Sequence, residues 1–85
     1  MKIYEIIFSK QAVKDIKTLS PKLKIKLKEI LRNRIAIDPH SGKKLVGDLK
    51  GLYSVRLSYQ DRIVYAVNEK QQIVILHRAR THYGD

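Results

Sequence analysis

The chain has 85 residues, enough for one small domain with a thin core, and its hydrophobic content of 44% argues against disorder. It contains no cysteine, which excludes disulfides, thiolate nucleophiles and the usual zinc sites. Its formal net charge of +10 favours a nucleic acid or another polyanion as partner. The N-terminal run MKIYEIIFSK is too short for a signal peptide, and nothing approaches a membrane span, so we expect a soluble, cytoplasmic protein with no membrane partner.

The first half of the chain predicts a strand followed by two helices. Residues 2–8 are rich in β-branched and aromatic side chains, which is typical of a strand. Ser9 is a suitable N-cap for a first helix, whose apolar residues recur at helical spacing: Ala12, Val13, Ile16 and Leu19. The next segment, SPKLKIKLKEILRNRI, opens with lysines alternating with apolar residues, so a strand is an alternative there.

Two features favour a second helix in this segment. Ser20 followed by Pro21 is a helix N-cap and first-turn pair. The alternation breaks at Ile30-Leu31, whereas a helix would place four residues on one face: Leu23, Leu27, Ile30 and Leu31. The lysines would then form a solvated outer surface, and Asp38-Pro39 would end the helix.

The second half predicts a three-stranded antiparallel meander over residues 51–58, 62–67 and 73–80, joined by the turns YQD and NEKQQ. The fold is therefore expected to be α+β, with the N-terminal strand, the helical hairpin and the meander forming one small sheet packed on the helices. If both turns are odd in length, the helix-facing side carries Tyr53, Val55, Leu57, Ile63, Tyr65, Val67, Ile73, Ile75 and His77.

The opposite face would then be basic, with Ser54, Arg56, Arg62, Val64, Leu76, Arg78 and Arg80. In this register Leu57 opposes Ile63, Arg56 lies beside Val64, and Arg62 lies directly opposite Arg78. Like charges that face each other across a sheet are unfavourable, so the arginine pair would make sense if an anion sat between them.

The acidic residues do not indicate a metal site. They are scattered, no two share a ligand spacing, and Asp38, Asp48 and Asp61 fall at turns or helix ends. Glycines 42, 47 and 51 read as turn residues. Metal-free RNA cleavage is compatible with the composition, because RNA supplies its own 2′-hydroxyl nucleophile and the protein must move two protons and stabilise a phosphate. Arginine and histidine suit those tasks.

The histidines differ as candidates for proton transfer. His77 would point into the core, and His40 would lie in a surface loop after Pro39. His82 lies beyond the last predicted strand, beside Tyr83, where packing does not explain it. Of the three histidines, His82 is therefore the candidate for a functional role, and a histidine can carry a proton near neutral pH.

The order of elements, the segment LKGLYSVRLSYQDRIVYAV and the terminal His-Tyr resemble the RelE/ParE superfamily of bacterial toxins, the toxin halves of type II toxin–antitoxin systems. The His-Tyr end is most similar to the Txe/YoeB branch. The resemblance implies one RelE-like toxin domain over residues 1–85. For the RelE and Txe/YoeB branches it implies ribosome-dependent cleavage of mRNA in the A site, with no metal and no cofactor. The ParE branch instead inhibits DNA gyrase without catalytic activity of its own, and a plain basic binding module is a third interpretation.

By this resemblance the catalytic residues would be Arg62, at the scissile phosphate, together with Arg56, His82 and Tyr83. The RNA-binding residues would be Lys43, Lys44, Lys50, Arg78 and Arg80. The glutamate proposed as general base in Txe/YoeB toxins has no counterpart, since its place falls on Lys43. The base is then Asp48, His82, or a RelE-like set of basic residues. The partners would be a cognate antitoxin, acidic where it covers this face, and the ribosome with its mRNA. The oligomeric state stays open.

Overall fold

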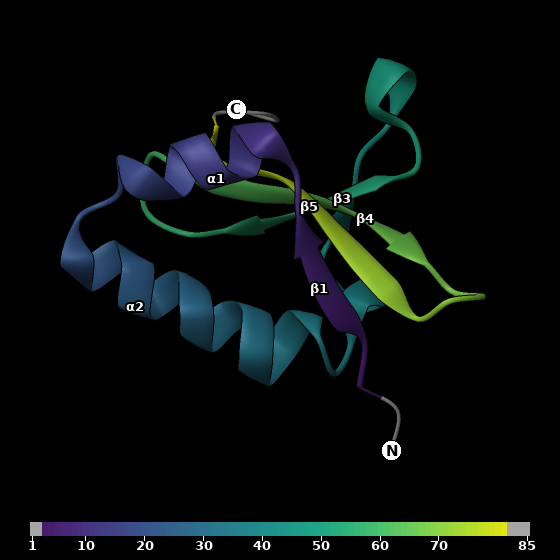
Figure 1. Cartoon of the computed structure of the whole chain (residues 1–85). Coiled ribbons are helices and arrows are strands. Elements are labelled where there is room, and N and C mark those ends of the chain that lie inside the picture. The colour runs from purple at the N-terminus through teal and green to yellow at the C-terminus, as the bar shows by residue number, and fades with distance from the viewer. Residues whose placement is uncertain (1–2, 82–85) are drawn as a thin grey trace.

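The computed structural model describes residues 3–81 and confirms the expected α+β fold (Figure 1). The first three elements are β1 (Glu5–Phe8), α1 (Lys10–Lys17) and α2 (Pro21–Ile30), and α2 continues into a π-type turn, Leu31–Ile35. The short strand β2 (Lys43–Lys44) lies between two 3-10 turns, Pro39–Ser41 and Gly47–Leu49. The meander consists of β3 (Leu52–Arg56), β4 (Arg62–Asn68) and β5 (Ile73–Thr81).

Both helices begin where the sequence predicts. Ser9 and Ser20 have extended backbones, and their hydroxyl oxygens accept hydrogen bonds from amides three residues on, at 3.0 Å and 3.3 Å respectively. Pro21 opens α2, where its missing N–H removes no helical hydrogen bond. Val13, expected on the buried side of α1, is 41% exposed, because that side is centred on Ala12 and Asp15.

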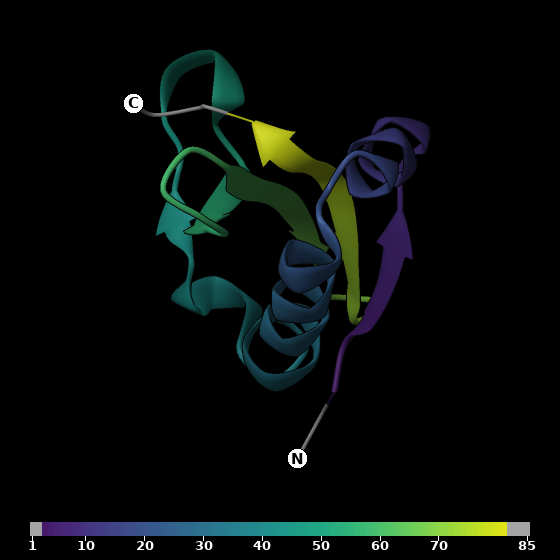
Figure 2. The same ribbon diagram turned by 90° about the vertical axis from the view of Figure 1, so that its left-hand side faces the viewer.

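Within residues 3–81 the strands form one five-stranded sheet in the order β1-β5-β4-β3-β2. β1 pairs with β5 in parallel, and the other neighbours are antiparallel. The structure corrects the prediction at both edges, since β1 begins at Glu5 and the two residues of β2 had been read as loop. Figure 2 shows the sheet curving around α2, with α1 lying beside β5.

The core lies between the sheet and the helices. It combines α1 and α2 side chains with one face of the central strands, and its members are Ala12, Leu19, Leu27, Leu31, Ile35, Tyr53, Val55, Leu57, Ile63, Tyr65, Val74, Leu76 and Ala79. Tyr65 is the largest fully buried side chain, and its hydroxyl donates a 2.6 Å hydrogen bond to the carbonyl of Pro39. The predicted helix-facing residues of β3 and β4 are therefore confirmed.

The register of β3 against β4 differs by two residues from the prediction. Val55, not Leu57, lies opposite Ile63, and Arg56 lies opposite Arg62 rather than beside Val64. The cause is a five-residue turn, 57–61, in which the amides of Leu57 and Ser58 donate to the carbonyl of Asp61 at 2.9 Å and 3.1 Å. Because the shift is even, every side chain of β3 and β4 keeps its predicted face.

The predicted faces of β5 are wrong. Asn68 pairs with Ile73, so the preceding turn has four residues, and Gln72 in it has a φ of 56°. An even turn reverses the alternation: Val74 and Leu76 are fully buried in the core, while Ile73, Ile75 and His77 are only half-buried.

A β-bulge then changes the register again near the end of β5. Leu76 and Ala79 both lie in the core, although strict alternation would put them on opposite faces. Val64 consequently lies opposite Arg78, and Arg62 lies opposite Thr81. The predicted Arg62–Arg78 pair is therefore wrong.

Candidate nucleic-acid interface

The face of the sheet turned away from the helices, here called the outer face, brings together predicted site residues from β2, β3 and β4 within residues 3–81. Arg56 and Arg62 lie directly opposite each other on β3 and β4. Lys43 pairs with Ser54, which lies two positions before Arg56 on β3. Directly paired residues share a face, with Cβ atoms about 5 Å apart. The register thus brings Lys43, Arg56 and Arg62 into one cluster, which we call the outer basic cluster.

The two arginines of this cluster are paired directly across neighbouring strands. Arg56 is exposed, makes no ion pair within residues 3–81, and donates from Nη1 to the carbonyl of Tyr59 at 3.1 Å. Arg62, half-buried, opens β4. Like charges on directly opposed residues destabilise a strand pair, and a phosphate bound between them would turn that repulsion into attraction. The expected pair of Arg62 with Arg78 is absent, and Arg56 is instead the cation that lies opposite Arg62.

Ser54 lies at the centre of the outer face with an unsatisfied hydroxyl. It is 3% exposed, and its Oγ has no hydrogen-bond partner in the part of the chain that the structure describes. Its cross-strand neighbours are Lys43 and Val64. Buried polar groups are nearly always paired, and leaving one unpaired costs about 1–3 kcal/mol. Ser54 was predicted to lie on this face, but no role was predicted for it.

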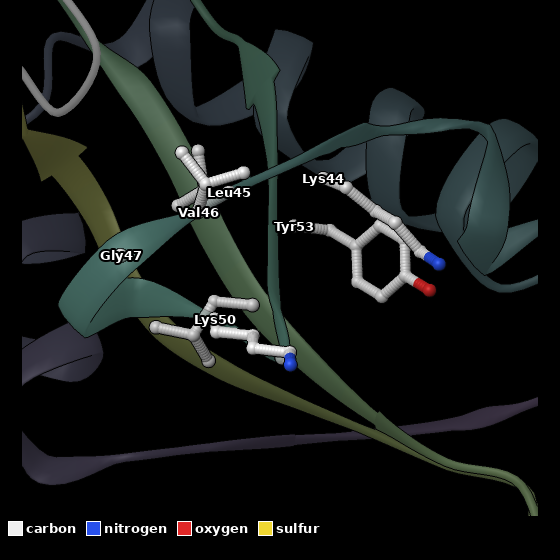
Figure 3. Close-up of a pocket in the computed structure, with 8 residues that line it drawn as sticks. Lys44, Leu45, Val46, Gly47, Lys50 and Tyr53 are labelled. Atoms are coloured by element: carbon white, nitrogen blue, oxygen red, sulfur yellow. The ribbon is translucent and has the colours of Figure 1, made fainter.

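Lys44 and Lys50 are separated from the outer basic cluster and line a pocket of 380 Å³ at the β2 edge of the sheet (Figure 3). Lys44 pairs with Tyr53, a core residue, so it belongs to the helix-facing side. The rest of the pocket is mostly aliphatic or glycine: Leu45, Val46, Gly47, Gly51 and Leu52. Gly51 has a φ of 94°, a conformation that few other residues adopt.

Arg78 and Arg80 are held by α1 and by the 57–61 turn. Arg78 Nε lies 2.8 Å from Asp15 Oδ2. Arg80 donates from Nη1 to both the carbonyl and the hydroxyl of Thr18 at 3.1 Å, and its Nε lies 3.5 Å from Asp61 Oδ1. The two carboxylates are almost fully buried. Both arginines therefore lie along the seam between α1 and β5.

Asp15 is the site residue that sequence reasoning missed. Burial alone would raise the pKa of its carboxyl group, but hydrogen bonds from Arg78, Gln11 and the Ala79 amide outweigh burial and hold the pKa below its ordinary value of 3.8. The signal was present in the sequence, because Asp15 stands one helical turn after Ala12 on the apolar side of a basic helix. An acid at such a position indicates a buried partner.

The remaining predictions concern the histidines. His40 is exposed, as expected, and its Nε2 lies 2.7 Å from Glu69 Oε1. His77 is half-buried and does not belong to the core. His82 and Tyr83 lie outside the described residues.

Within residues 3–81 no three metal-ligating side chains gather at one point, and no helix there is long and apolar enough to cross a membrane.

Comparison with solved structures gives RelE- and YoeB-like folds. A YoeB dimer structure from Staphylococcus aureus is 31% identical, with 94% of this chain and 98% of that chain covered and a TM-score of 0.79. A chain in the RelBE2 toxin–antitoxin complex from Mycobacterium tuberculosis is 26% identical, with coverages of 100% and 97% and a TM-score of 0.85. A YoeB/ParE toxin from Agrobacterium tumefaciens is 23% identical, with coverages of 93% and 99% and a TM-score of 0.83, and supports the fold.

Comparison of the sequence gives a match to a protein family, although no curated protein matches it. The family described as "ParE-like toxin of type II bacterial toxin-antitoxin system" matches residues 6–83, nearly the whole chain. The S. aureus YoeB, above 30% identity over almost the full length of both chains, points the same way. The chain belongs to the ParE-like toxins of type II bacterial toxin–antitoxin systems.

Proposed function

We propose that this toxin is a ribosome-dependent endoribonuclease that cleaves mRNA without a metal or a cofactor. The observation that carries the proposal is the outer basic cluster, Lys43, Arg56 and Arg62, which adjacent strands gather on one face of a chain with a net charge of +10. The similarity to YoeB from S. aureus supports an enzyme of this class.

The chemistry follows from RNA itself. The 2′-oxygen loses its proton and attacks the adjacent phosphorus, the bond from phosphorus to the 5′-oxygen breaks, and that oxygen takes up a proton. The products are a 2′,3′-cyclic phosphate and a 5′-hydroxyl. Negative charge grows on the phosphate oxygens in the transition state, where positioned cations act most strongly. Arg62 and Arg56 supply that stabilisation, since each guanidinium offers several donors to phosphate oxygens.

The protons need a different group. Lys43, which is exposed, stands where related toxins have a glutamate and offers no carboxylate to act as a base, so it serves as a cation. Asp48 lies in the 3-10 turn Gly47–Leu49, next to the pocket-lining residue Gly47 and away from the outer basic cluster. We therefore assign proton transfer to His82, with Tyr83 orienting the RNA. Lys44, Lys50, Arg78 and Arg80 hold flanking phosphates.

The partners follow from this activity. The toxin–antitoxin complexes among its structural neighbours support a cognate antitoxin as a partner. An antitoxin that covers the outer basic cluster would be acidic there, because that cluster is positively charged. Translating ribosomes with their mRNA would place the active protein in the cytoplasm.

The test is to express the chain and map 5′-hydroxyl ends in messenger RNA. Cuts in phase with codons, together with poor cleavage of free transcripts, would support the proposal. The description of the family as ParE-like favours one alternative, inhibition of DNA gyrase. DNA damage with intact messages would establish the alternative and refute the endoribonuclease.

The assignment of His82 has its own test. His82→Gln should lower the cleavage rate by roughly 10²–10⁴-fold, the usual cost of losing a positioned proton carrier. The pH–rate profile should also lose its inflection near neutrality. Tyr83→Phe separates the contribution of the hydroxyl from that of the ring. An unchanged pH profile in His82→Gln would move the role to another residue.

A further inference from the structure

Asp15, in the middle of α1, is bound to two consecutive residues at the end of β5. Its Oδ2 accepts hydrogen bonds from Arg78 Nε at 2.8 Å and from the Ala79 amide at 3.1 Å. Its Oδ1 accepts from Gln11 at 3.0 Å and from Arg78 Nη2 at 3.4 Å. Asp15 is 6% exposed. Its carboxylate therefore accepts hydrogen bonds from three residues, and both of its oxygens are engaged.

These contacts coincide with the β-bulge of β5. The register changes between Val64 and Tyr65 of β4, opposite the stretch of β5 that runs from Leu76 to Arg78. A bulge leaves a backbone group without its ladder partner. The amide of Ala79 points instead to Asp15, so the carboxylate satisfies the donor that the bulge would otherwise leave buried and unpaired.

The bulge also decides where Arg78 points. Continuing the register of Val67 and Val74 along the strands would place residue 78 opposite Ile63, on the core face. With the bulge, Arg78 lies opposite Val64, and its guanidinium is fixed against α1 through two donors. The Arg78 side chain remains 32% exposed. It lies on β5 next to β4, the strand that begins with Arg62.

We propose that Asp15 is a positioning residue of the nuclease site: it fixes the bulge of β5 and orients the Arg78 guanidinium toward bound RNA. The inference rests on the proposed function for its kinetic consequence. Asp15 does not contact RNA, because it is buried beneath Arg78. A purely structural acid would stabilise the fold without coupling to Arg78 in cleavage, and the two roles are therefore separable.

The experiment is a double-mutant cycle with translating ribosomes. Asp15→Asn keeps the shape and loses the charge, so it should lower the cleavage rate about 10²-fold, as small misplacements in active sites do. Arg78→Ala should lose a similar factor, and the double variant should lose no more than Arg78→Ala alone. Glu29→Gln is the matched control, because it removes one negative charge from an exposed position on α2 and should leave the rate unchanged.

Two further measurements keep the result decisive. Should Asp15→Asn fail to fold, Arg78→Lys replaces it: the lysine keeps the charge but cannot make both bonds to Asp15, so its rate should fall nearly as far as that of Arg78→Ala. In NMR spectra of the folded protein, the Arg78 Nε–H should be protected from exchange, and this protection should be lost in Asp15→Asn. This readout needs no cleavage, so it separates failure of the positioning role from failure of the nuclease proposal. Additive losses, or wild-type activity in Asp15→Asn or in Arg78→Lys, would overturn the positioning role.

Discussion

Among Gly42, Gly47 and Gly51, Gly42 is the glycine at which an added Cβ would meet neighbouring atoms. It directly precedes β2, and a Cβ added there would lie 2.4 Å from Tyr65 Oη and 3.0 Å from the carbonyl oxygen of Ser54. Its own φ of −73° suits alanine, so Gly42→Ala introduces no backbone strain. The effect of the substitution is therefore purely steric, and it acts on the buried hydrogen bond from Tyr65 to Pro39.

The magnitude follows from three contributions. Displacing the Tyr65 hydroxyl leaves a buried donor and the Pro39 carbonyl unpaired, at a cost of about 1–3 kcal/mol. Overpacking the contact adds about 1–3 kcal/mol. Alanine restricts the unfolded chain and returns about 0.4–1 kcal/mol. We expect Gly42→Ala to destabilise the fold by about 2–4 kcal/mol and, for a domain of this size, to lower Tm by about 10–30 °C.

Urea unfolding followed by circular dichroism measures this cost, and two variants serve as controls. Gly47→Ala has no heavy atom within 4 Å of its new Cβ and a φ of 68°, so it should cost only the ~1–2 kcal/mol of backbone strain. In a Tyr65→Phe background the nearest clashing atom is absent, and the cost of Gly42→Ala should shrink. A Gly42→Ala protein as stable as the wild type, or an equal cost in both backgrounds, would refute the steric argument.

Three other predictions concern single side chains. Arg62→Ala should lower mRNA cleavage by about 10²–10³-fold, as losing one donor to a developing oxyanion does. The unfolding free energy should change by less than ~1 kcal/mol, because Arg62 lies outside the core. A large fall in Tm would argue against its place on the outer face. Ser54→Ala should leave stability unchanged or raise it by up to about 1 kcal/mol in urea unfolding, because it removes a buried hydroxyl with no partner within residues 3–81, and a clear loss of stability would reveal a partner. Burial raises the pKa of Tyr65 from 10.0 to about 12, so its folded form binds a proton that the unfolded chain releases above pH 10. The corresponding ~2.7 kcal/mol should be fully present below pH 10 and lost as the pH rises to 12, and Tyr65→Phe should show a shallower decline over this range in alkaline unfolding.

The parts of the fold that were predicted correctly depend on short stretches of sequence. Ser9, Ser20 and Pro21 set the helix starts through contacts within one turn, and those contacts form as expected. The faces of β3 and β4 also held, although their register was wrong, because a shift of two residues preserves the alternation. Periodicity therefore determined which side chains point inward on these strands, even where the pairing differed.

The faces of β5 could not be predicted because they depend on counts that the pattern does not contain. One residue fewer in the turn before Ile73 exchanged inner and outer residues, so Val74 and Leu76 took the places expected for Ile75 and His77. From Ile73 to His77 every residue is apolar or only weakly polar. Hydrophobicity alone therefore does not distinguish the register set by a five-residue turn from the register set by a four-residue turn. The bulge then changed the faces a second time.

The positions of the site arginines on β5 were also not predictable from the sequence pattern. Sequence reasoning grouped Arg56, Arg62, Arg78 and Arg80 as outward-facing cations, and the structure divides them by their partners. Arg78 is bound by an acid 63 residues away in the sequence, and Arg80 by Thr18 and Asp61. An arginine already paired with a buried carboxylate adds little net field at the surface, whereas Lys43 and Arg56, with no carboxylate against them within residues 3–81, add their full charge. Attraction of an RNA phosphate at a distance should therefore depend mainly on the outer basic cluster, and Arg78 should matter once the phosphate is in contact. Neutralising Lys43 or Arg56 should then weaken the salt dependence of association, while Arg78→Ala should slow cleavage with that salt dependence nearly intact.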